Sequence, residues 1–383
     1  MKIALVHDWL TGMRGGEKVL LELLRLFPDA PAFTLLWNRG SVHPEIEARV
    51  RGVSFLQSLP GAARLYRYYL PLFPAAARSL DLAGFDVVLS SSHAVAHGAR
   101  LPPEALHVCY LHTPMRYLWD SAGDYFHFGR ARRSKRAALA LLAPYLRRFD
   151  LRAASRVNFF LANSENVSDR IRRCYGADAV VIHPPVDTDF FTPAVTASGD
   201  YYLLVSSLEP YKRVDLAIDA FATFARGSRR LLVAGGGTLE RQLRARARPP
   251  VELLGAVSDE RLRELYRGCR ALIFPGREDF GMVPVEAQAC GRPVICFGEG
   301  GALETVADGR TGIHFRPQTP AALAAAVAHS ETIEWDHAAI RAHSLQFSRA
   351  QFRDKMKAFW TAHVSHDWPF EQDASRDARR AHL

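Results

Sequence analysis

The chain has 383 residues, of which 48% are hydrophobic and 23% are charged. This length and composition allow about two domains with buried cores and argue against broad disorder. The formal net charge of +9 favours an anionic partner, such as a nucleotide, a phospholipid surface or a nucleic acid. No apolar run approaches the roughly 20 residues that span a bilayer, and the first residues resemble no signal peptide. We therefore expect a soluble, cytoplasmic protein.

The cysteines lie among apolar neighbours, without a Cys-x-x-Cys pair or a cluster with histidine. This pattern predicts buried, reduced thiols rather than disulfides or metal ligands. The residues concerned are Cys109, Cys174, Cys269, Cys290 and Cys296.

The first apolar run, from Lys2 to His7, predicts a parallel strand. A loop with Gly15 and Gly16 follows it, before an amphipathic helix from Val19 to Phe27. A glycine-rich loop that opens a helix can hold a phosphate group. The loop has neither the Gly-x-Gly-x-x-Gly dinucleotide pattern nor the Gly-Lys-[Ser/Thr] ending of a P-loop. A tight turn and a phosphate-binding loop both remain open as interpretations.

Short apolar runs separated by helical segments recur through the N-terminal half. Such alternation predicts a doubly wound parallel sheet. Because ligands bind beyond the carboxyl ends of strands in such sheets, His112, Ser164 and Glu165 are candidate site residues. The predicted strands are 85–90, 107–112, 157–162 and 180–183.

Two basic stretches lie between these strands. Residues 64–70 interleave arginine with tyrosine, and residues 129–136 lead to Arg147 and Arg148. Arginine beside aromatic rings suits a membrane interface as well as a nucleic acid, and a solvated positive face is the simplest alternative. No nucleic-acid-binding module is recognisable. We rank an anionic membrane surface before nucleic acid and predict no nucleic-acid partner.

A segment rich in Thr, Pro, Ser and Gly, from Thr192 to Gly199, predicts a linker between domains. Just before it, Asp187-Thr188-Asp189 matches the Asp-x-Asp pattern of metal-binding sugar transferases. A three-residue match at a domain crossing favours a structural role, and we expect no metal.

The strand pattern then restarts and predicts a second parallel sheet. A helix from Ala350 to Val364 follows, and the polar residues from Ser365 to Leu383 predict a disordered tail. The strands expected in the second sheet are 201–206, 230–234, 251–255, 271–274 and 293–297.

The loop after the strand 271–274 carries the strongest indication of function. Gly281 allows a sharp turn and Pro284 suits the first turn of a helix, so amide groups point into the loop. These amides favour a phosphate, while Glu278 and Glu286 can accept hydrogen bonds from hydroxyl groups. Phosphate and hydroxyls together describe a nucleotide sugar. The alternative is that both glutamates are solvated surface charges.

The run Glu278-Asp279-Phe280-Gly281-x-x-Pro284-x-Glu286-Ala287 resembles the signature loop of the retaining, metal-independent glycosyltransferases of family 4. The run from His112 to Asp120 resembles a bacterial subgroup of that family, the mannosyltransferases of O-antigen and exopolysaccharide assembly. The resemblance implies an α/β protein with the GT-B fold, in which two Rossmann-like, doubly wound parallel-sheet domains face a central cleft. The expected boundaries are 1–190 for the acceptor-side domain, 191–199 for the linker, 200–345 for the nucleotide-sugar-binding domain, 346–364 for a helix that crosses back, and 365–383 for the tail.

The resemblance also implies roles for single residues. His112 would lie beside the transferred sugar, Glu278 would orient that sugar, and Lys212 would meet the leaving diphosphate. Glu286 would hold the ribose hydroxyls, while Arg116 and Tyr117 would lie on the acceptor side. The full set expected at the donor is Gly15, Gly16, Ser207, Lys212, Asp279, Phe280, Gly281, Met282, Val283 and Glu286.

One position departs from the family. An arginine usually stands five residues before the lysine and helps it to hold the diphosphate, but this chain has Ser207 there. Arg213, next to Lys212, need not point the same way and is not expected to replace it fully. We expect weaker donor binding than in relatives with the arginine.

The resulting hypothesis is a transferase that moves a hexose, with mannose from GDP-mannose as the first expectation, to a lipid-linked or saccharide acceptor. It would serve cell-surface polysaccharide synthesis, including lipopolysaccharide, without a cofactor beyond the nucleotide sugar, in the cytoplasm or at the inner face of the membrane. The alternatives are a UDP-sugar donor, a phosphorylase or sugar-nucleotide epimerase on the same fold, and a catalytically weakened paralogue that serves as a binding subunit.

Overall fold

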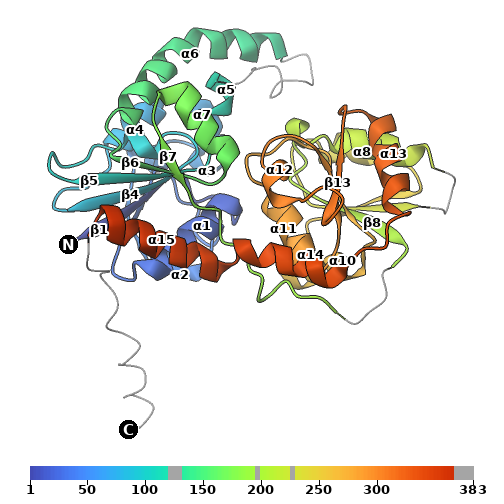
Figure 1. Ribbon diagram of the computed structural model, residues 1–383. Helices are drawn as coiled ribbons and strands as arrows, with labels where there is room; N and C mark the ends of the chain where they lie inside the picture. Colours follow the sequence, from blue (N-terminus) through green and yellow to red (C-terminus); the bar gives the residue numbers. More distant parts are fainter. Residues whose placement is uncertain (120–131, 195–198, 225–228, 366–383) are drawn as a thin grey trace.

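The computed structural model describes residues 1–119, 132–194, 199–224 and 229–365. The described chain forms two parallel sheets, each covered by helices, which lie side by side in Figure 1. This arrangement of two Rossmann-like domains confirms the predicted fold class. We call the domain of the first sheet N-terminal and that of the second sheet C-terminal.

The N-terminal sheet has the strand order β3-β2-β1-β4-β5-β6-β7. The direction of winding reverses between β1 and β4, where Val6 pairs with Ser90 and His7 with Ser91. In such sheets a ligand-binding crevice lies beyond the carboxyl ends of the two strands at this point. The strands are β1 (Ile3–His7), β2 (Ala32–Thr34), β3 (Val50–Val53), β4 (Val87–Ser92), β5 (Leu106–Leu111), β6 (Phe159–Ala162) and β7 (Ala179–Val181).

The C-terminal sheet has the strand order β10-β9-β8-β11-β12-β13, and its winding reverses between β8 and β11. Leu272 pairs with Leu203 at this position. Its strands are β8 (Tyr201–Val205), β9 (Arg230–Ala234), β10 (Val251–Gly255), β11 (Leu272–Phe274), β12 (Val294–Phe297) and β13 (Gly312–Phe315).

The helices that cover the sheets are mostly short. In the N-terminal domain they are α1 (Gly15–Leu26), α2 (Pro44–Glu47), α3 (Ala62–Leu65), α4 (Phe73–Arg78), α5 (Arg116–Trp119), α6 (Arg132–Ala154) and α7 (Glu165–Tyr175). In the C-terminal half they are α8 (Val214–Ala222), α9 (Glu240–Arg246), α10 (Asp259–Gly268), α11 (Met282–Ala289), α12 (Ala302–Thr305), α13 (Pro320–Ser330), α14 (His337–Ser344) and α15 (Arg349–His363). The 3₁₀ segments are Phe55–Ser58, Tyr66–Leu72, Ala96–Gly98, Pro210–Lys212 and Leu345–Phe347.

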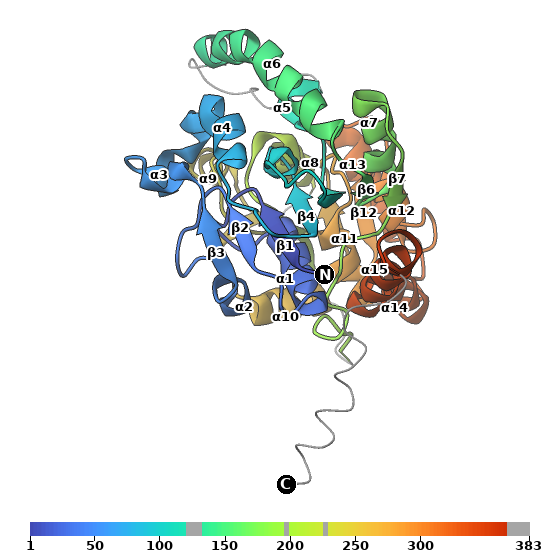
Figure 2. The same cartoon turned by 90° about the vertical axis from the view of Figure 1, so that its left-hand side faces the viewer.

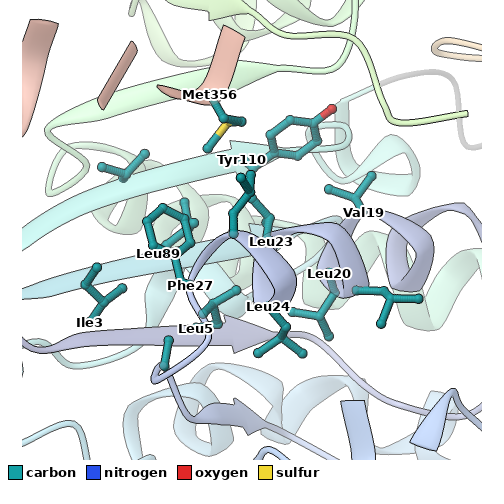
Figure 3. Close-up of a cluster of buried hydrophobic side chains, with 14 of the residues drawn as sticks. Ile3, Leu5, Val19, Leu20, Leu23, Leu24, Phe27, Leu89, Tyr110 and Met356 are labelled. Carbon is teal, nitrogen blue, oxygen red and sulfur yellow. The ribbon is translucent and has the colours of Figure 1, made fainter. Parts of the chain in front are cut away.

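The last helix, α15, packs on the N-terminal sheet although it follows the C-terminal domain (Figures 1 and 2). Trp360 is fully buried, with its ring 4.6 Å from that of Phe27, and Phe352 lies 6.1 Å from Tyr110. Figure 3 shows part of this core, in which α1, the sheet and Met356 of α15 meet. Because burial of one such side chain contributes about 1.5–3 kcal/mol, this contact holds the chain's C-terminal helix firmly on the first domain.

The sequence patterns located most strands within one or two residues but missed β2, β3 and β13. These strands have three or four residues each, and β3 alternates between half-buried and exposed positions at the edge of its sheet. Such short strands carry too little periodicity to stand out from loops. The predicted helix 19–27 begins earlier, at Gly15, where the Glu17 carboxylate accepts the N–H of Arg14.

Some predictions fall outside the described residues. They concern Asp120, residues 129–131, part of the linker (195–198) and nearly all of the tail (366–383). The side chains of residues 132–136 are likewise not described. The domain boundaries remain predictions. In the described part of the chain, no helix combines the length and the apolar character needed to cross a membrane.

Candidate active site

The site lies where the carboxyl ends of β1, β4 and β5 meet the loops after β8 and β11. Two helices begin here, α1 in the N-terminal domain and α11 in the C-terminal domain. A β-carbon added to Gly15 would stand 3.3 Å from Sδ of Met282, and one added to Gly16 would stand 3.4 Å from His7 and 3.7 Å from Nε2 of His112. The first turns of the two helices therefore lie close together, and larger residues at these glycines would push on the opposite domain or on the histidines.

Helix α11 begins at a glycine with an unusual backbone conformation. Gly281 has φ +92°, a conformation that other residues rarely adopt, and Pro284 is the third residue of the helix. The segment Gly300-Gly301 supports the loop from behind, since Gly301 N–H donates to the Glu278 carbonyl at 2.9 Å. A β-carbon on Gly301 would come within 2.3 Å of Cα of Phe280. This second glycine-rich segment therefore packs against the backbone of residues 278–280, in the loop before α11.

Lys212 and Glu278 form an ion pair in which both side chains are largely buried. They line a small crevice together with Ser206 and Gly276. Ser207 is exposed, and its backbone carbonyl accepts the hydroxyl of Ser206. The predicted catalytic lysine and glutamate are thus in contact, whereas the donor contact of Ser207 remains a prediction.

Arg213 turns away from this crevice. It has φ +52°, and its guanidinium donates to Gln318 at 2.9 Å and lies 3.4 Å from Asp215. The Arg213 guanidinium thus pairs with Gln318 and Asp215, and the expectation that it does not fully replace the missing arginine remains a prediction.

Glu286 is buried and joins the two domains. Its carboxylate accepts a hydrogen bond from Lys18 Nζ at 2.9 Å and another from the Tyr266 hydroxyl at 3.0 Å. The nearby Glu286 charge raises the pKa of Lys18, and burial together with Glu286 raises the pKa of Tyr266 well above its usual value. Lys18 was not among the predicted site residues, because its partner is 268 positions away in the chain.

Asp279 forms a second link between the domains. Its Oδ2 accepts hydrogen bonds from Arg116 at 3.0 and 2.6 Å, its Oδ1 lies 3.2 Å from Arg170, and its backbone carbonyl accepts the Ser164 hydroxyl at 2.7 Å. Arg116 also lies over the ring of Tyr211 at 5.7 Å. In this structure Arg116 therefore contacts the loop before α11, and the predicted roles of Arg116 at the acceptor and Asp279 at the donor remain predictions.

Glu304 completes the contact between the domains. Its carboxylate accepts the N–H groups of Glu165 and Asn166 at 2.8 and 3.0 Å, at the start of α7, and lies 3.3 Å from His183. A carboxylate at a helix N-terminus is favoured by the partial positive charge there. The predicted candidates Ser164 and Glu165 thus lie at the domain interface.

The remaining predicted residues have packing contacts. The Phe280 ring is buried and stacks on His183 at 5.4 Å, Met282 packs beside it, and Val283 is half-buried. The Tyr117 hydroxyl contacts Sδ of Met115 at 3.0 Å.

The imidazole rings of His7, His93 and His112 lie close together near the start of α1. Ser91 Oγ lies 2.8 Å from His112 Nε2 and 3.1 Å from His7 Nδ1, and the His93 ring is 6.2 Å from that of His112. Burial and the other two histidines hold the pKa of His112 well below its usual value. His112 is therefore a neutral imidazole at the end of β5, able to form hydrogen bonds without carrying charge.

Asp8 anchors this histidine cluster. It is fully buried, and its carboxylate accepts four backbone N–H groups, from His93 to Ala96, at 2.6 to 2.9 Å. Burial opposes ionisation, but His93 and these N–H groups hold the pKa of Asp8 below its usual value. Asp8 and His93 follow strands β1 and β4, so the rule used for His112 could have found them.

The Asp-x-Asp match has a structural explanation. Asp187 forms an ion pair with Arg349 at 2.8 Å, and the Thr188 carbonyl accepts a hydrogen bond from Arg341 at 2.8 Å. No group of three or more His, Cys, Asp or Glu side chains arranged to hold a metal occurs in the part of the chain that the structure describes.

The two Rossmann-like domains meet where the winding of each sheet reverses. Helices α1 and α11 begin there, and acidic and basic groups of the two domains form pairs. This arrangement defines the GT-B class of fold. The described architecture is similar to that of solved structures of this kind. Anabaena HepE in complex with UDP and glucose has a TM-score of 0.69 at 18% identity, with 95% of this chain and 100% of that chain covered. The lipopolysaccharide outer core galactosyltransferase WaaB, in its apo form, has a TM-score of 0.65 at 16% identity, with 94% and 100% covered.

Sequence comparison places the chain within this class. The family "Glycosyltransferase Family 4" matches residues 13–190, and "Glycosyl transferases group 1" matches residues 187–342. The chain therefore belongs to the family 4, group 1 glycosyltransferases. A D-inositol 3-phosphate glycosyltransferase of Gordonia bronchialis is 31% identical over 238 residues, which is 50% of this chain and 52% of that protein. The chain thus spans about half the length of the curated relatives it matches.

Proposed function

We propose that this chain is a retaining, metal-independent glycosyltransferase that moves a hexose from a nucleotide sugar to a hydroxyl acceptor. The observations that carry the proposal are the meeting of the first turns of α1 and α11, where a β-carbon added to Gly15 would stand 3.3 Å from Sδ of Met282, and the Lys212–Glu278 pair in the loops after β8 and β11. Facing helix N-termini and a lysine favour a diphosphate, and the neighbouring carboxylates suit sugar hydroxyls.

In this proposal the donor replaces existing contacts at the site. The diphosphate competes with Glu278 for Lys212, which releases the glutamate to orient hydroxyls of the transferred sugar. The amides of Gly281 to Val283 and the ammonium of Lys212 then stabilise the charge that develops on the leaving group. Glu286, held by Tyr266 and Lys18, presents a buried acceptor for ribose hydroxyls.

The transfer needs no protein nucleophile. The acceptor oxygen attacks the anomeric carbon from the face that the diphosphate leaves, and the bond to the phosphate oxygen breaks with its electron pair. The leaving phosphate takes the proton of the acceptor hydroxyl. Neutral His112, held by Ser91, donates or accepts a hydrogen bond at the transferred sugar, and its lowered pKa keeps it from repelling developing positive charge on that sugar.

For the donor we propose mannose from GDP-mannose, on the resemblance of the His112–Trp119 run to mannosyltransferases. A UDP-sugar is the second candidate, because a solved structure of this fold contains UDP and glucose. A thermal-shift panel of GDP- and UDP-sugars distinguishes them, since a ligand at a hundred times its Kd stabilises the folded state by about 2.7 kcal/mol. Turnover is followed in the same panel by release of nucleoside diphosphate.

Each alternative predicts a different result in this panel. Stabilisation without turnover would support the binding subunit that Ser207 suggests. Turnover that needs inorganic phosphate, or conversion of the donor without an acceptor, would support a phosphorylase or an epimerase. If no nucleotide sugar shifts the melting temperature or is consumed, the proposed function is wrong.

For the acceptor we propose a lipid-linked or saccharide hydroxyl, reached at an anionic membrane surface. Exposed apolar side chains lie on neighbouring elements of the N-terminal domain: Tyr68 is 70% exposed and Leu141 is 86% exposed. α4 joins these elements, because Arg78 lies 5.3 Å from the Phe149 ring of α6. Exposed Arg64 and Arg67 add positive charge beside Tyr68. Rings and arginines of this kind suit the headgroup layer.

Liposome co-sedimentation tests the membrane partner. We expect pelleting with vesicles that contain anionic lipid and much weaker pelleting with neutral vesicles. The double variant Arg64→Glu, Arg67→Glu should lose this difference, whereas the exposed pair Arg172→Glu, Arg173→Glu on α7 serves as the charge-matched control. Equal pelleting with both kinds of vesicle would exclude the electrostatic interaction.

A further inference from the structure

His93 has no role in the proposed transfer, yet the fold places it beside the groups that do. It follows β4, its ring meets that of Trp9 edge-on at 4.5 Å, and it lies 6.2 Å from the His112 ring. Its side chain is 29% exposed, in contrast to the fully buried Asp8 beside it. His93 is thus a mostly buried imidazole, with under a third of its side chain exposed, on the N-terminal side of the site.

Asp8 sets the orientation of this imidazole. The carboxylate lies 3.2 Å from Nδ1 of His93 and also accepts the backbone N–H of the same residue at 2.6 Å. Because an ionised carboxylate can only accept, we assign the ring proton to Nδ1, the nitrogen that faces Asp8. Nε2, on the other edge of the ring, is then a hydrogen-bond acceptor directed away from Asp8.

Burial keeps the His93 ring neutral. Burial is the largest influence and lowers the pKa of His93, and His7 and Arg14 act in the same direction. Asp8 and Glu17 oppose them without reversing the shift. His112, from β5, is itself neutral at pH 7. The acceptor lone pair at Nε2 is therefore available at neutral pH.

We propose that His93, oriented by Asp8, binds the acceptor by accepting a hydrogen bond from a hydroxyl next to the one that is glycosylated. This inference rests on the proposed function and adds the acceptor subsite to it. The ligand class is a polyhydroxylated ring, a sugar or a cyclitol, because such a ring offers a second hydroxyl beside the reacting one. The half-buried indole of Trp9 borders the same position and offers an apolar surface for the ring's C–H groups. His93 holds the acceptor in place, while the reacting hydroxyl gives its proton to the leaving diphosphate.

The test compares His93→Phe, which keeps a ring but removes the acceptor nitrogen, with His93→Gln, whose amide oxygen can take its place. Methyl α-mannoside and D-inositol 3-phosphate are the probe acceptors, with the nucleotide sugar that the thermal-shift panel identifies. We expect His93→Phe to raise the acceptor KM about tenfold, as loss of one hydrogen bond predicts. His93→Gln should recover most of this loss. The Kd for the donor and acceptor-independent donor hydrolysis should stay within about twofold of wild type.

A second measurement does not depend on turnover. Calorimetric binding of methyl α-mannoside, which has no titrating group in this range, should weaken in wild type as pH falls and protonates His93, with nucleoside diphosphate present, and His93→Gln should lose most of this dependence. His329→Phe, at an exposed position of α13, is the matched control. An unchanged acceptor affinity in His93→Phe would overturn the inference. If wild type uses no nucleotide sugar at all, the proposed function fails first, and the binding measurement still decides the role of His93.

Discussion

The ion-pair cluster around Asp279 gives the sharpest quantitative prediction. Asp279 belongs to the C-terminal domain, whereas both arginines that bind it, Arg116 and Arg170, belong to the N-terminal domain. Asp279→Asn keeps the shape of the side chain but removes its charge. The substitution therefore weakens the contact between the domains at the residue next to Glu278.

The size of the effect follows from the hydrogen bonds. Asp279 accepts three of them from the two guanidinium groups, at 2.6, 3.0 and 3.2 Å. A hydrogen bond to a charged group is worth about 1.5–3 kcal/mol and a neutral one about 0.5–1.5 kcal/mol, so each bond loses about 1 kcal/mol. These side chains are 6–14% exposed, so solvent screening reduces the total only moderately, to about 2 kcal/mol. The equilibrium between joined and separated domains should shift about thirtyfold toward separation.

Small-angle X-ray scattering and donor binding measure this shift. We expect Asp279→Asn to have a larger radius of gyration and a weaker donor affinity than wild type. A double-mutant cycle with Arg170→Met should give a coupling energy of about 1–2 kcal/mol. Asp178→Asn, which removes a carboxylate that is 93% exposed, is the control and should behave as wild type. An unchanged radius together with zero coupling would refute the interpretation of Asp279 as a link between the domains.

Three further predictions concern the donor and pH. Lys212→Met should lower kcat/KM by about 10²–10³-fold, because it removes stabilisation of the leaving group, and should also lower the melting temperature, because Glu278 loses its largely buried partner; equal activity in a coupled diphosphate-release assay would exclude Lys212 from that role. Ser207→Arg should tighten donor binding about ten- to a hundredfold by calorimetry, since it adds a charge-assisted contact, and an unchanged Kd would remove Ser207 from the donor site. Burial lowers the pKa of His107 to about 3, so the unfolded chain binds a proton below pH 6.5 that the folded chain does not. The free energy of unfolding should therefore be highest above pH 6.5 and fall between pH 6.5 and 3. Denaturant titrations at several pH values should show a smaller fall for His107→Gln than for wild type. An identical fall in both proteins would contradict the assignment.

Much of the architecture was predictable from local patterns. Apolar strands that alternate with helices imply parallel sheets, and Gly281 with Pro284 marks the start of α11, because both signals depend on residues close together in the chain. The family resemblance rested on the same loop, and the structure brings its Glu278 into contact with Lys212.

Local patterns could not reveal which residues join the two domains. Lys18 and Glu286 are 268 positions apart, Arg116 and Asp279 are 163 apart, and Asp8 and His93 are 85 apart. A single lysine or aspartate has the same local signature whether it is solvated or paired, since pairing depends on distances set by the packing of whole sheets. The sequence by itself therefore determined the two sheets and the start of α11. Only the tertiary structure decided that Glu286 and Asp279 are shared between the domains and that His93 stands beside His112.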